Sequence, residues 1–217
     1  MKKNLLSILC ISILTLSVFS CKDKAKEAVT SEAEAVTMVE AAAIEYTVNT
    51  DASSIAWKGF KPTGEHFGTI SLKNGSINLK DGKITAGNFI IDMGSIVVDD
   101  IPAEEKSNAK LVGHLSNSDF FDVEKFPTAT FEITGVTEND GKTLLSGNLT
   151  LKEATNNVTF PISVINEGDT VTLESETFTI DRTKWNVQYG SKSIFDNLGD
   201  KFINDDIELK VSLKATK

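Results

Sequence analysis

Few side chains in this sequence are of types that carry out chemistry, and those few stand far apart. The two histidines are His66, within Gly-Glu-His-Phe-Gly, and His114. A metal site would join them with Glu65, but zinc usually takes three or four ligands at characteristic spacing. The sequence contains no Gly-x-Ser-x-Gly, His-Glu-x-x-His or phosphate-binding-loop pattern. We therefore expect no catalytic residue, no metal and no cofactor, and we interpret both imidazoles as structural hydrogen-bonding groups.

Arg182 is the only arginine of the chain, within Asp-Arg-Thr-Lys-Trp. A guanidinium can bind a diphosphate through two parallel hydrogen bonds, or it can stack on an aromatic ring. We favour a structural role in which Arg182 stacks on Trp57 or Trp185 and closes one end of the fold. Contact with a lipid headgroup is the alternative.

Phenylalanine dominates the aromatic residues, with 12 Phe against two Tyr and two Trp. Phe adds apolar area without a polar group that needs a partner. Core packing is the commoner role for any single one, but together they would suit a dry lumen that binds a hydrocarbon rather than a sugar or nucleotide. The residues that we expect to contact such a ligand are Trp57, Phe67, Phe89, Ile91, Phe120, Phe121, Phe131, Leu149, Phe160, Phe178, Arg182 and Trp185.

The elements that must position these side chains are mostly strands. In the last segment Ile207, Leu209, Val211 and Leu213 alternate with charged or polar residues, which predicts one buried and one solvated face. Turn signals separate such segments, and they are Asn74-Gly75, Asp81-Gly82, Asp140-Gly141 and residues 167–169. An antiparallel meander of about eight strands hides its edges completely when it closes into a barrel, whose interior has room for side chains or one ligand.

Two helical segments are expected to interrupt the meander. Asp100 as a cap, Pro102 near the first turn and the acids that follow predict a helix that runs to His114 or Leu115. A second helix is predicted within residues 193–202, where Ile194, Phe195, Leu198 and Phe202 stand at helical spacing. Either helix could cover a barrel end.

Residues 113–133, GHLSNSDFFDVEKFPTATFEI, join a helix tail, a Phe pair between Asp119 and Asp122, a Lys-Phe-Pro stop and a strand. This sequence closely resembles the signature of the YceI-like family, lipocalin-like β-barrels that bind polyisoprenoid and other amphiphilic lipids. The resemblance covers most of residues 45–217, although Lys152-Glu153 stands where the family usually has a glycine. It implies an all-β lipocalin-like barrel and an isoprenoid or other long-chain lipid as partner. We interpret the two aspartates as turn and cap groups that hold the Phe pair at a barrel mouth.

The first 20 residues have the layout of a secretory signal, with Lys2 and Lys3 before an apolar run too short to span a bilayer. The run ends at Val-Phe-Ser-Cys, which resembles a lipobox and predicts lipidation of Cys21; an ordinary secreted protein is the alternative. Acyl chains on Cys21 would anchor the protein stably in the cell envelope, and Lys22 after it favours the outer membrane.

Removal of this leader takes Lys+Arg from 22 to 20 against 31 acids, so the formal net charge goes from -9 to -11. That acidity argues against nucleic acid as a partner. Residues 21–44 are Ala/Glu-rich and are interpreted as a tether, with an amphipathic helix packed on the domain as the alternative. Residues 45–217 form the barrel domain. We expect an envelope lipoprotein that carries or sequesters a lipid, or alternatively a structural or protein-interaction barrel; a homodimer is one option for its oligomeric state.

Overall fold

The structure is a computed structural model that describes residues 25–217. The predicted leader and the predicted lipidation site Cys21 lie outside the described residues. Among those that are described, no helix has the length and apolar character needed to cross a bilayer.

Strands make up most of the described chain, with one α-helix, α1 (Lys106–Ser116), and short 3-10 turns. The strands are β1 (Lys26–Glu27), β2 (Val29–Glu32), β3 (Ile44–Val48), β4 (Ser54–Lys61), β5 (Gly64–Ile70), β6 (Leu72–Lys80), β7 (Lys83–Asp92), β8 (Val97–Val98), β9 (Thr128–Asn139), β10 (Lys142–Leu151), β11 (Ala154–Asn166), β12 (Thr170–Ser175), β13 (Phe178–Asp181) and β14 (Asp206–Thr216).

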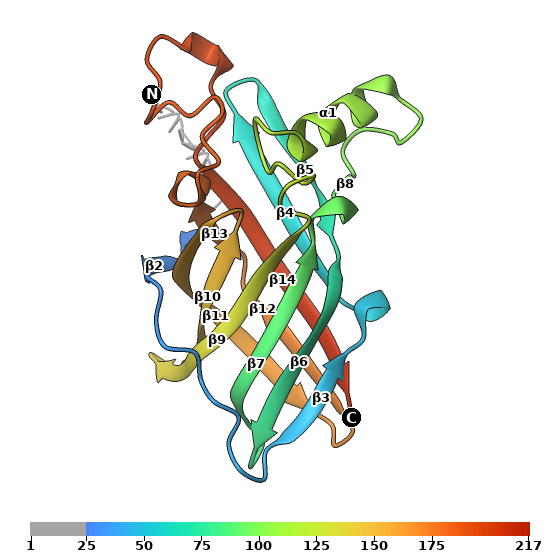
Figure 1. Ribbon diagram of the computed structural model, residues 1–217, viewed down its shortest axis with the longest axis vertical. Coiled ribbons are helices and arrows are strands. Elements are labelled where there is room, and N and C mark those ends of the chain that lie inside the picture. The colour runs from blue at the N-terminus through green and yellow to red at the C-terminus, as the bar shows by residue number, and fades with distance from the viewer. Residues whose placement is uncertain (1–24) are drawn as a thin grey trace, which may run out of the picture.

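Eight of these strands close into an antiparallel barrel, in the order β12, β11, β10, β9, β7, β6, β3, β14, with β14 pairing back to β12 (Figure 1). The predicted lipocalin-like all-β barrel is confirmed. The long β14 completes it: its C-terminal half pairs with β12 and β3, and its N-terminal half pairs with β13 and β4. Above the ring the sheet continues as the β4–β5 hairpin and β8.

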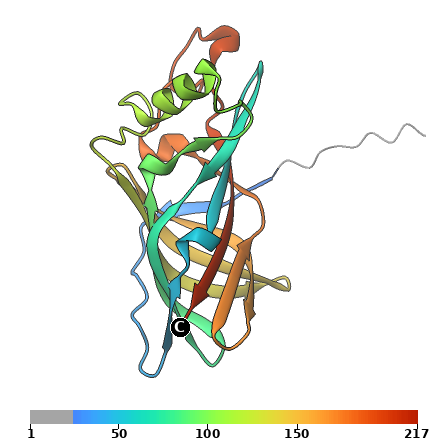
Figure 2. The same cartoon turned by 90° about the vertical axis from the view of Figure 1, so that its right-hand side faces the viewer.

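The two ends of the barrel differ. We call the "mouth end" the one that carries α1, the tip of the β4–β5 hairpin and residues 188–205; both views place these together (Figures 1 and 2). We call the opposite end, where the C-terminus lies, the "turn end". There Asp81-Gly82 and Asp140-Gly141 adopt positive φ values (52° and 77°, 50° and 74°) in two-residue hairpin turns, as predicted.

Asn74-Gly75 does not form the predicted turn. Both residues lie inside β6, directly after a register shift against β7. Gly75 is required there for packing, because a β-carbon would stand 2.9 Å from the Phe89 ring. The same dipeptide that favours a hairpin thus serves a bulged strand.

Alternate residues of neighbouring strands point into the barrel interior. Ile133, Val158, Val171 and Leu173 are each at most 1% exposed. Full burial of such a side chain contributes roughly 1.5–3 kcal/mol. The apolar alternation read from the sequence therefore points inward, as β structure requires.

Within the predicted tether of residues 21–44, the described part, residues 25–44, is neither free nor the packed helix weighed as the alternative. Strand β1 pairs in parallel with β13, and β2 pairs antiparallel with β11. Further along, the Asn148 side chain exchanges two hydrogen bonds with the backbone of Glu34, at 3.0 and 2.7 Å. The N-terminal half of β11 does not pair with β12, so a gap, which we call the seam, is left between β11 and β13. Residues 26–32 fill this seam.

The two predicted helices fare differently. The first exists as α1, but it begins at Lys106 after Glu105, which makes no side-chain cap, and the predicted cap Asp100 binds His66 and the Phe67 N–H instead. The second is wrong: residues 193–202 form turns and a single 3-10 turn, Gly199–Lys201. Left-handed φ values at Asn197 (62°) and Gly199 (58°) interrupt the helical course.

Candidate ligand-binding lumen

A cavity of about 410 Å³ occupies the mouth end of the barrel. A second chamber of about 80 Å³ lies deeper, and Ile55, Ile91, Leu149 and Leu209 line both, so the two chambers adjoin each other and we refer to them together as the lumen. The exposed residues Lys61 and Lys201 stand at the outer edge of the larger chamber. The lumen is therefore reached from the mouth end.

Polar groups are confined to the outer part of this lumen. The lower chamber is lined by aliphatic and Phe side chains alone. The polar or charged residues that line the upper chamber are Lys61, His66, His114, Arg182, Lys201 and Asn204. An apolar interior with polar groups at its entrance matches an amphiphile that enters tail first.

Most of the predicted ligand-contacting residues do line the lumen, on two levels. The upper chamber takes Trp57, Ile91, Phe120, Phe121, Leu149 and Arg182. The lower chamber takes Phe89, Ile91, Phe131, Leu149, Phe160 and Phe178.

Two predicted residues do not line either chamber. Phe67 is 40% exposed, because strict alternation along β5 points it away from the lumen-facing His66. Trp185 is fully buried in a 3-10 turn behind the wall, where its indole N–H donates to the Leu149 carbonyl at 2.8 Å. Both side chains therefore lie outside the lumen, in which we had predicted them to contact the ligand.

A row of Phe rings crosses the lower part of the barrel. Ring centroids lie 6.3 Å apart for Phe89 and Phe131, 5.8 Å for Phe131 and Phe160, and 4.2 Å for the stacked Phe160 and Phe178. Gly147 makes room for this row, because a β-carbon there would stand 2.3 Å from the Phe131 ring. The rings give the lower chamber an apolar surface with no hydrogen-bonding groups.

Arg182 lines the upper chamber and binds the backbone of the mouth end. Its guanidinium is fully buried and donates to the carbonyls of Val187, Ile203 and Asn204 at 2.5, 3.0 and 3.0 Å. Burial lowers its pKa, Asp205 at 3.5 Å opposes that shift, and the group remains charged at neutral pH. The structural role is the one that the geometry favours.

The aromatic partner of Arg182 is Phe120, whose ring centroid lies 5.3 Å from the guanidinium carbon. The prediction of Trp57 or Trp185 as partner is wrong: Trp57 faces the lumen and donates to the Thr69 carbonyl, while Trp185 donates to Leu149. Phe120 is only 4% exposed and meets Phe121 edge to face at 5.1 Å. The Phe pair is therefore part of the cavity wall.

The turn that carries this Phe pair is organised by Asn117. Its side chain accepts from the Asp119 N–H at 2.9 Å, and its carbonyl accepts from the Phe120 and Asp122 N–H groups. Asp122 adopts a left-handed φ of 50°, as expected for a turn residue. The capping role that we predicted for the aspartates thus belongs to Asn117.

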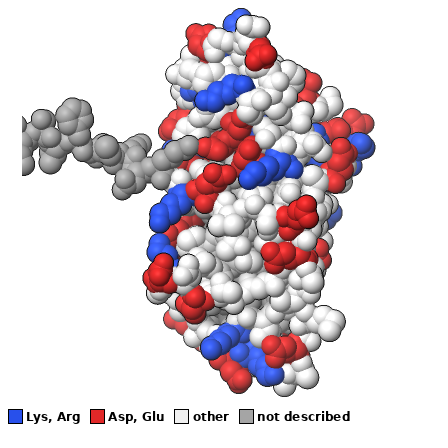
Figure 3. All heavy atoms as spheres, turned by 90° about the vertical axis from the view of Figure 1, so that its left-hand side faces the viewer, with Lys and Arg blue, Asp and Glu red and all other residues white. Residues whose placement is uncertain are grey.

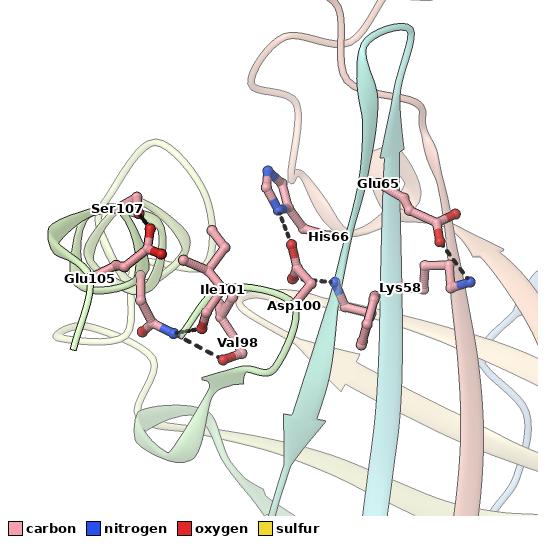
Figure 4. Close-up of polar contacts among 10 residues, drawn as sticks. Lys58, Glu65, His66, Val98, Asp100, Ile101, Glu105 and Ser107 are labelled. Carbon is pink, nitrogen blue, oxygen red and sulfur yellow. Dashed lines mark hydrogen bonds and ion pairs between the residues drawn. The ribbon is translucent and has the colours of Figure 1, made fainter. Parts of the chain in front are cut away.

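Asp100 joins the β4–β5 hairpin to the segment that leads into α1 (Figure 4). Its carboxylate lies 2.7 Å from His66 Nδ1 and accepts from the Phe67 N–H at 3.0 Å. Burial would raise the pKa of Asp100, but these hydrogen bonds outweigh it and the pKa lies below its usual value. From α1, the Asn108 amide donates to the carbonyls of Val98 and Ile101.

The metal site weighed for His66 does not assemble. Glu65 bonds to Lys58 (Figure 4), and His114 packs edge to face against Tyr189 at 4.7 Å. Across the described residues, no group of three or more His, Cys, Asp or Glu side chains is placed to hold a metal ion. On the face shown in Figure 3, acidic and basic side chains are interspersed.

Sequence reasoning missed the aliphatic half of the wall. Leu111 and Leu115 line the upper chamber from α1, and their i, i+4 spacing was the signal for an apolar face. Met93, Ile96 and Ile203 come from short turns and loops, where no periodic pattern marks a residue as lumen-facing.

Comparison with known proteins agrees with this architecture. A family model described as the YceI-like domain matches residues 46–215. A UPF0312 protein of Pseudomonas aeruginosa (strain LESB58) is 41% identical over 64 residues, which cover 30% of this chain and 34% of the relative. A UPF0312 protein of Pseudomonas paraeruginosa is 39% identical over a stretch of the same length. The matched stretch thus spans about a third of these curated relatives.

Two solved structures share the fold over most of the described chain. The crystal structure of Burkholderia cenocepacia BcnA has a TM-score of 0.58 and 23% identity, covering 78% of this chain and 99% of that one. A polyisoprenoid binding domain from Saccharophagus degradans, implicated in plant cell wall breakdown, has a TM-score of 0.56 and 14% identity, covering 79% and 97%. At such identities the likeness establishes the fold.

Proposed function

Because this chain belongs to the YceI-like domain family, we propose that it binds an isoprenoid, quinone-like or fatty-acyl amphiphile in its lumen and carries or sequesters that lipid. The observation that carries the proposal is the pair of adjoining chambers, of about 410 and 80 Å³, lined mainly by apolar side chains. A volume in this range is usual for sites that enclose small molecules. The polyisoprenoid-binding neighbour from Saccharophagus supports the same class of ligand.

The binding energy would come from burial of the lipid tail. Removing apolar surface from water contributes about 25 cal/mol per Å², before the cost of ordering the chain. The lower chamber provides no polar partner, so a headgroup there would lose its hydrogen bonds. The tail is therefore expected to point toward the Phe row and the headgroup toward the mouth end.

The cavity also bears on the second candidate, a structural or protein-interaction barrel. That function calls for a solid core and exposed docking loops. The lower part of the barrel, with its small chamber, comes nearer to a solid core than the mouth end does. The larger chamber at the mouth end favours the carrier.

We also propose that the protein works in the cell envelope, held by acyl chains on Cys21. Support comes from the leader-like residues 1–20 and the lipobox-like ending. Radiolabelled palmitate should be incorporated into the wild-type protein in its bacterial host and not into Cys21→Ser. Equal labelling of the two would refute the anchor without affecting the lumen.

Filling the lumen tests lipid binding directly. Gly59 lines the upper chamber, and a β-carbon there meets nothing within 4 Å, so Gly59→Phe would place a ring in the cavity without a clash at its β-carbon. Native mass spectrometry should show a co-purifying lipid on the wild type and little or none on Gly59→Phe. Gly135→Phe is the matched control, because Gly135 also has free space but lines neither chamber. An unliganded wild type, or a lipid retained equally by Gly59→Phe, would refute the proposal.

A further inference from the structure

The loop of residues 188–205 presents apolar side chains that no described part of the protein covers. Ile194 is 42% exposed and Phe195 is 48% exposed, and they are adjacent in the chain. They belong to the set whose helical spacing in the sequence predicted a second helix. Their loop lies at the mouth end (Figures 1 and 2), and both side chains are exposed there.

The base of this loop is firmly held, so its tip is presented in a defined place. The Arg182 guanidinium binds the carbonyls of Ile203 and Asn204, and Ser191, which is fully buried, forms a bridge with Ile203. The Phe195 N–H donates to the Ser191 carbonyl at 2.9 Å. Exposure of the two apolar side chains is therefore a feature of an ordered loop.

The loop that carries the exposed tip also lines the entrance of the lumen. Lys201, in the same loop, and Lys61, at the hairpin tip, line the outer edge of the upper chamber, and Ile203 lines its wall. Lys192 lies over the Phe202 ring at 4.8 Å. Large apolar side chains with lysines beside them are the composition of segments that enter the headgroup region of a bilayer.

From this arrangement we propose that the mouth end docks on a lipid bilayer, with Ile194 and Phe195 inserted below the headgroups, so that a lipid passes between membrane and lumen. The proposal rests on the proposed function, because a water-insoluble ligand is dissolved in the bilayer. Asp196 and Asp200 in the same loop offset its lysines, and the chain as a whole is acidic. Insertion is thus driven by apolar burial, and uncharged vesicles suffice.

A tryptophan placed at the tip reports on docking even in a chain that is also anchored elsewhere. Vesicles of brominated phosphatidylcholine should quench the tryptophan fluorescence of Phe195→Trp, in the full chain, more strongly than that of the parent protein. The parent protein gives the contribution of Trp57 and Trp185. Ile165→Trp is the matched control, because Ile165 is 58% exposed but lies beside the β11–β12 turn at the turn end. It should show no gain over the parent.

Two results would overturn the docking proposal. One is equal quenching of the two introduced tryptophans. The other is a blue shift of the Phe195→Trp emission that depends on protein concentration without vesicles, which would assign the tip to a second copy of this chain.

A transfer assay separates docking from lipid binding itself. Ile194→Ser with Phe195→Ser should slow uptake of a fluorescent prenol from phosphatidylcholine vesicles by at least about tenfold, since each large apolar side chain contributes more than one tenfold step. The control pair Met38→Ser with Ile165→Ser removes two exposed apolar side chains away from the mouth end and should leave the rate unchanged. Binding of the same prenol delivered from detergent should be equal in all three proteins. Absence of binding by either route would refute the lipid-binding function, whereas equal transfer rates would refute docking alone.

Discussion

The mouth end and the turn end of this barrel are held by different kinds of interaction. At the turn end, backbone ladders are joined by short turns such as Asp81-Gly82, and the Tyr46 hydroxyl donates to the Gly168 carbonyl. At the mouth end, only the β4–β5 hairpin and β8 continue the sheet, and single side chains bind loop carbonyls, as Arg182 and Asn108 do. A ladder distributes the stability of a strand pair over many hydrogen bonds, whereas at the mouth end a single side chain holds a whole loop in place. The entrance of the lumen therefore lies where a single substitution can change the structure.

The sharpest test of this difference is removal of the Arg182 guanidinium. Arg182→Met leaves three loop carbonyls without their donors and also removes the contact with Phe120. We expect a loss of about 3–5 kcal/mol in the free energy of unfolding, measured by urea denaturation. Lys184→Met, whose side chain is 38% exposed, should cost no more than about 1 kcal/mol. A similar small loss for both would show that the loop does not depend on Arg182.

The body of the barrel should respond through packing. Gly147→Ala places a methyl group 2.3 Å from the Phe131 ring, which must move toward the lower chamber. Overpacking of this kind costs about 1–3 kcal/mol, read as a lower urea midpoint. Gly135→Ala, on the neighbouring strand β9, meets nothing within 4 Å and should be nearly neutral apart from its effect on the unfolded chain. Equal effects at the two glycines would mean that the Phe131 ring can move aside without a cost in stability.

The N-terminal segment, which fills the seam between β11 and β13, can be tested through Asn148. Asn148→Ala removes its two bonds with the Glu34 backbone and its bond with Asn157, and we expect a loss of about 1–2 kcal/mol. Amide hydrogen exchange should accelerate at Glu34 and Thr37, which lie on the N-terminal segment, more than in the barrel strands. Asn88→Ala, at an exposed position of β7, is the control. Unchanged exchange at Glu34 would show that β1 and β2 hold the segment without Asn148.

The same contrast explains what could be predicted from the sequence. Strand β14 and the turns at Asp81-Gly82 and Asp140-Gly141 were predictable, because alternation and positive φ are written in adjacent residues. Pairing of residues 26–32 was not, because it depends on a seam formed by β11 and β13, more than a hundred residues away. A polar segment gives no sign of such a partner.

The lumen follows the same division. Phe89, Phe131 and Phe160 were predictable as interior residues because each sits in a long alternating strand. Phe67 was misplaced by a shift of one residue, which in a strand reverses the face. Asp100 was predicted as a helix cap because its true partner, His66, lies 34 residues away.

That contact gives the smallest expected effect and the one that depends on pH. Because the pKa of Asp100 lies below its usual value, its ionised form stabilises the folded state above the unfolded pKa, near 4. Asp100→Asn should therefore lower stability by about 1 kcal/mol at neutral pH, a modest figure because both partners are partly exposed to solvent.

As the pH falls through the lowered pKa, the wild type loses this contribution and the gap to Asp100→Asn should close. Chemical denaturation at a series of pH values measures the gap, and a double-mutant cycle with His66→Gln tests whether it belongs to this pair. The turn end offers the comparison: Lys217→Met breaks an exposed pair with Asp169 and should change stability little. A gap for Asp100→Asn that stays constant down to pH values below its lowered pKa would show that the hairpin is held to the α1 segment by shape and not by charge.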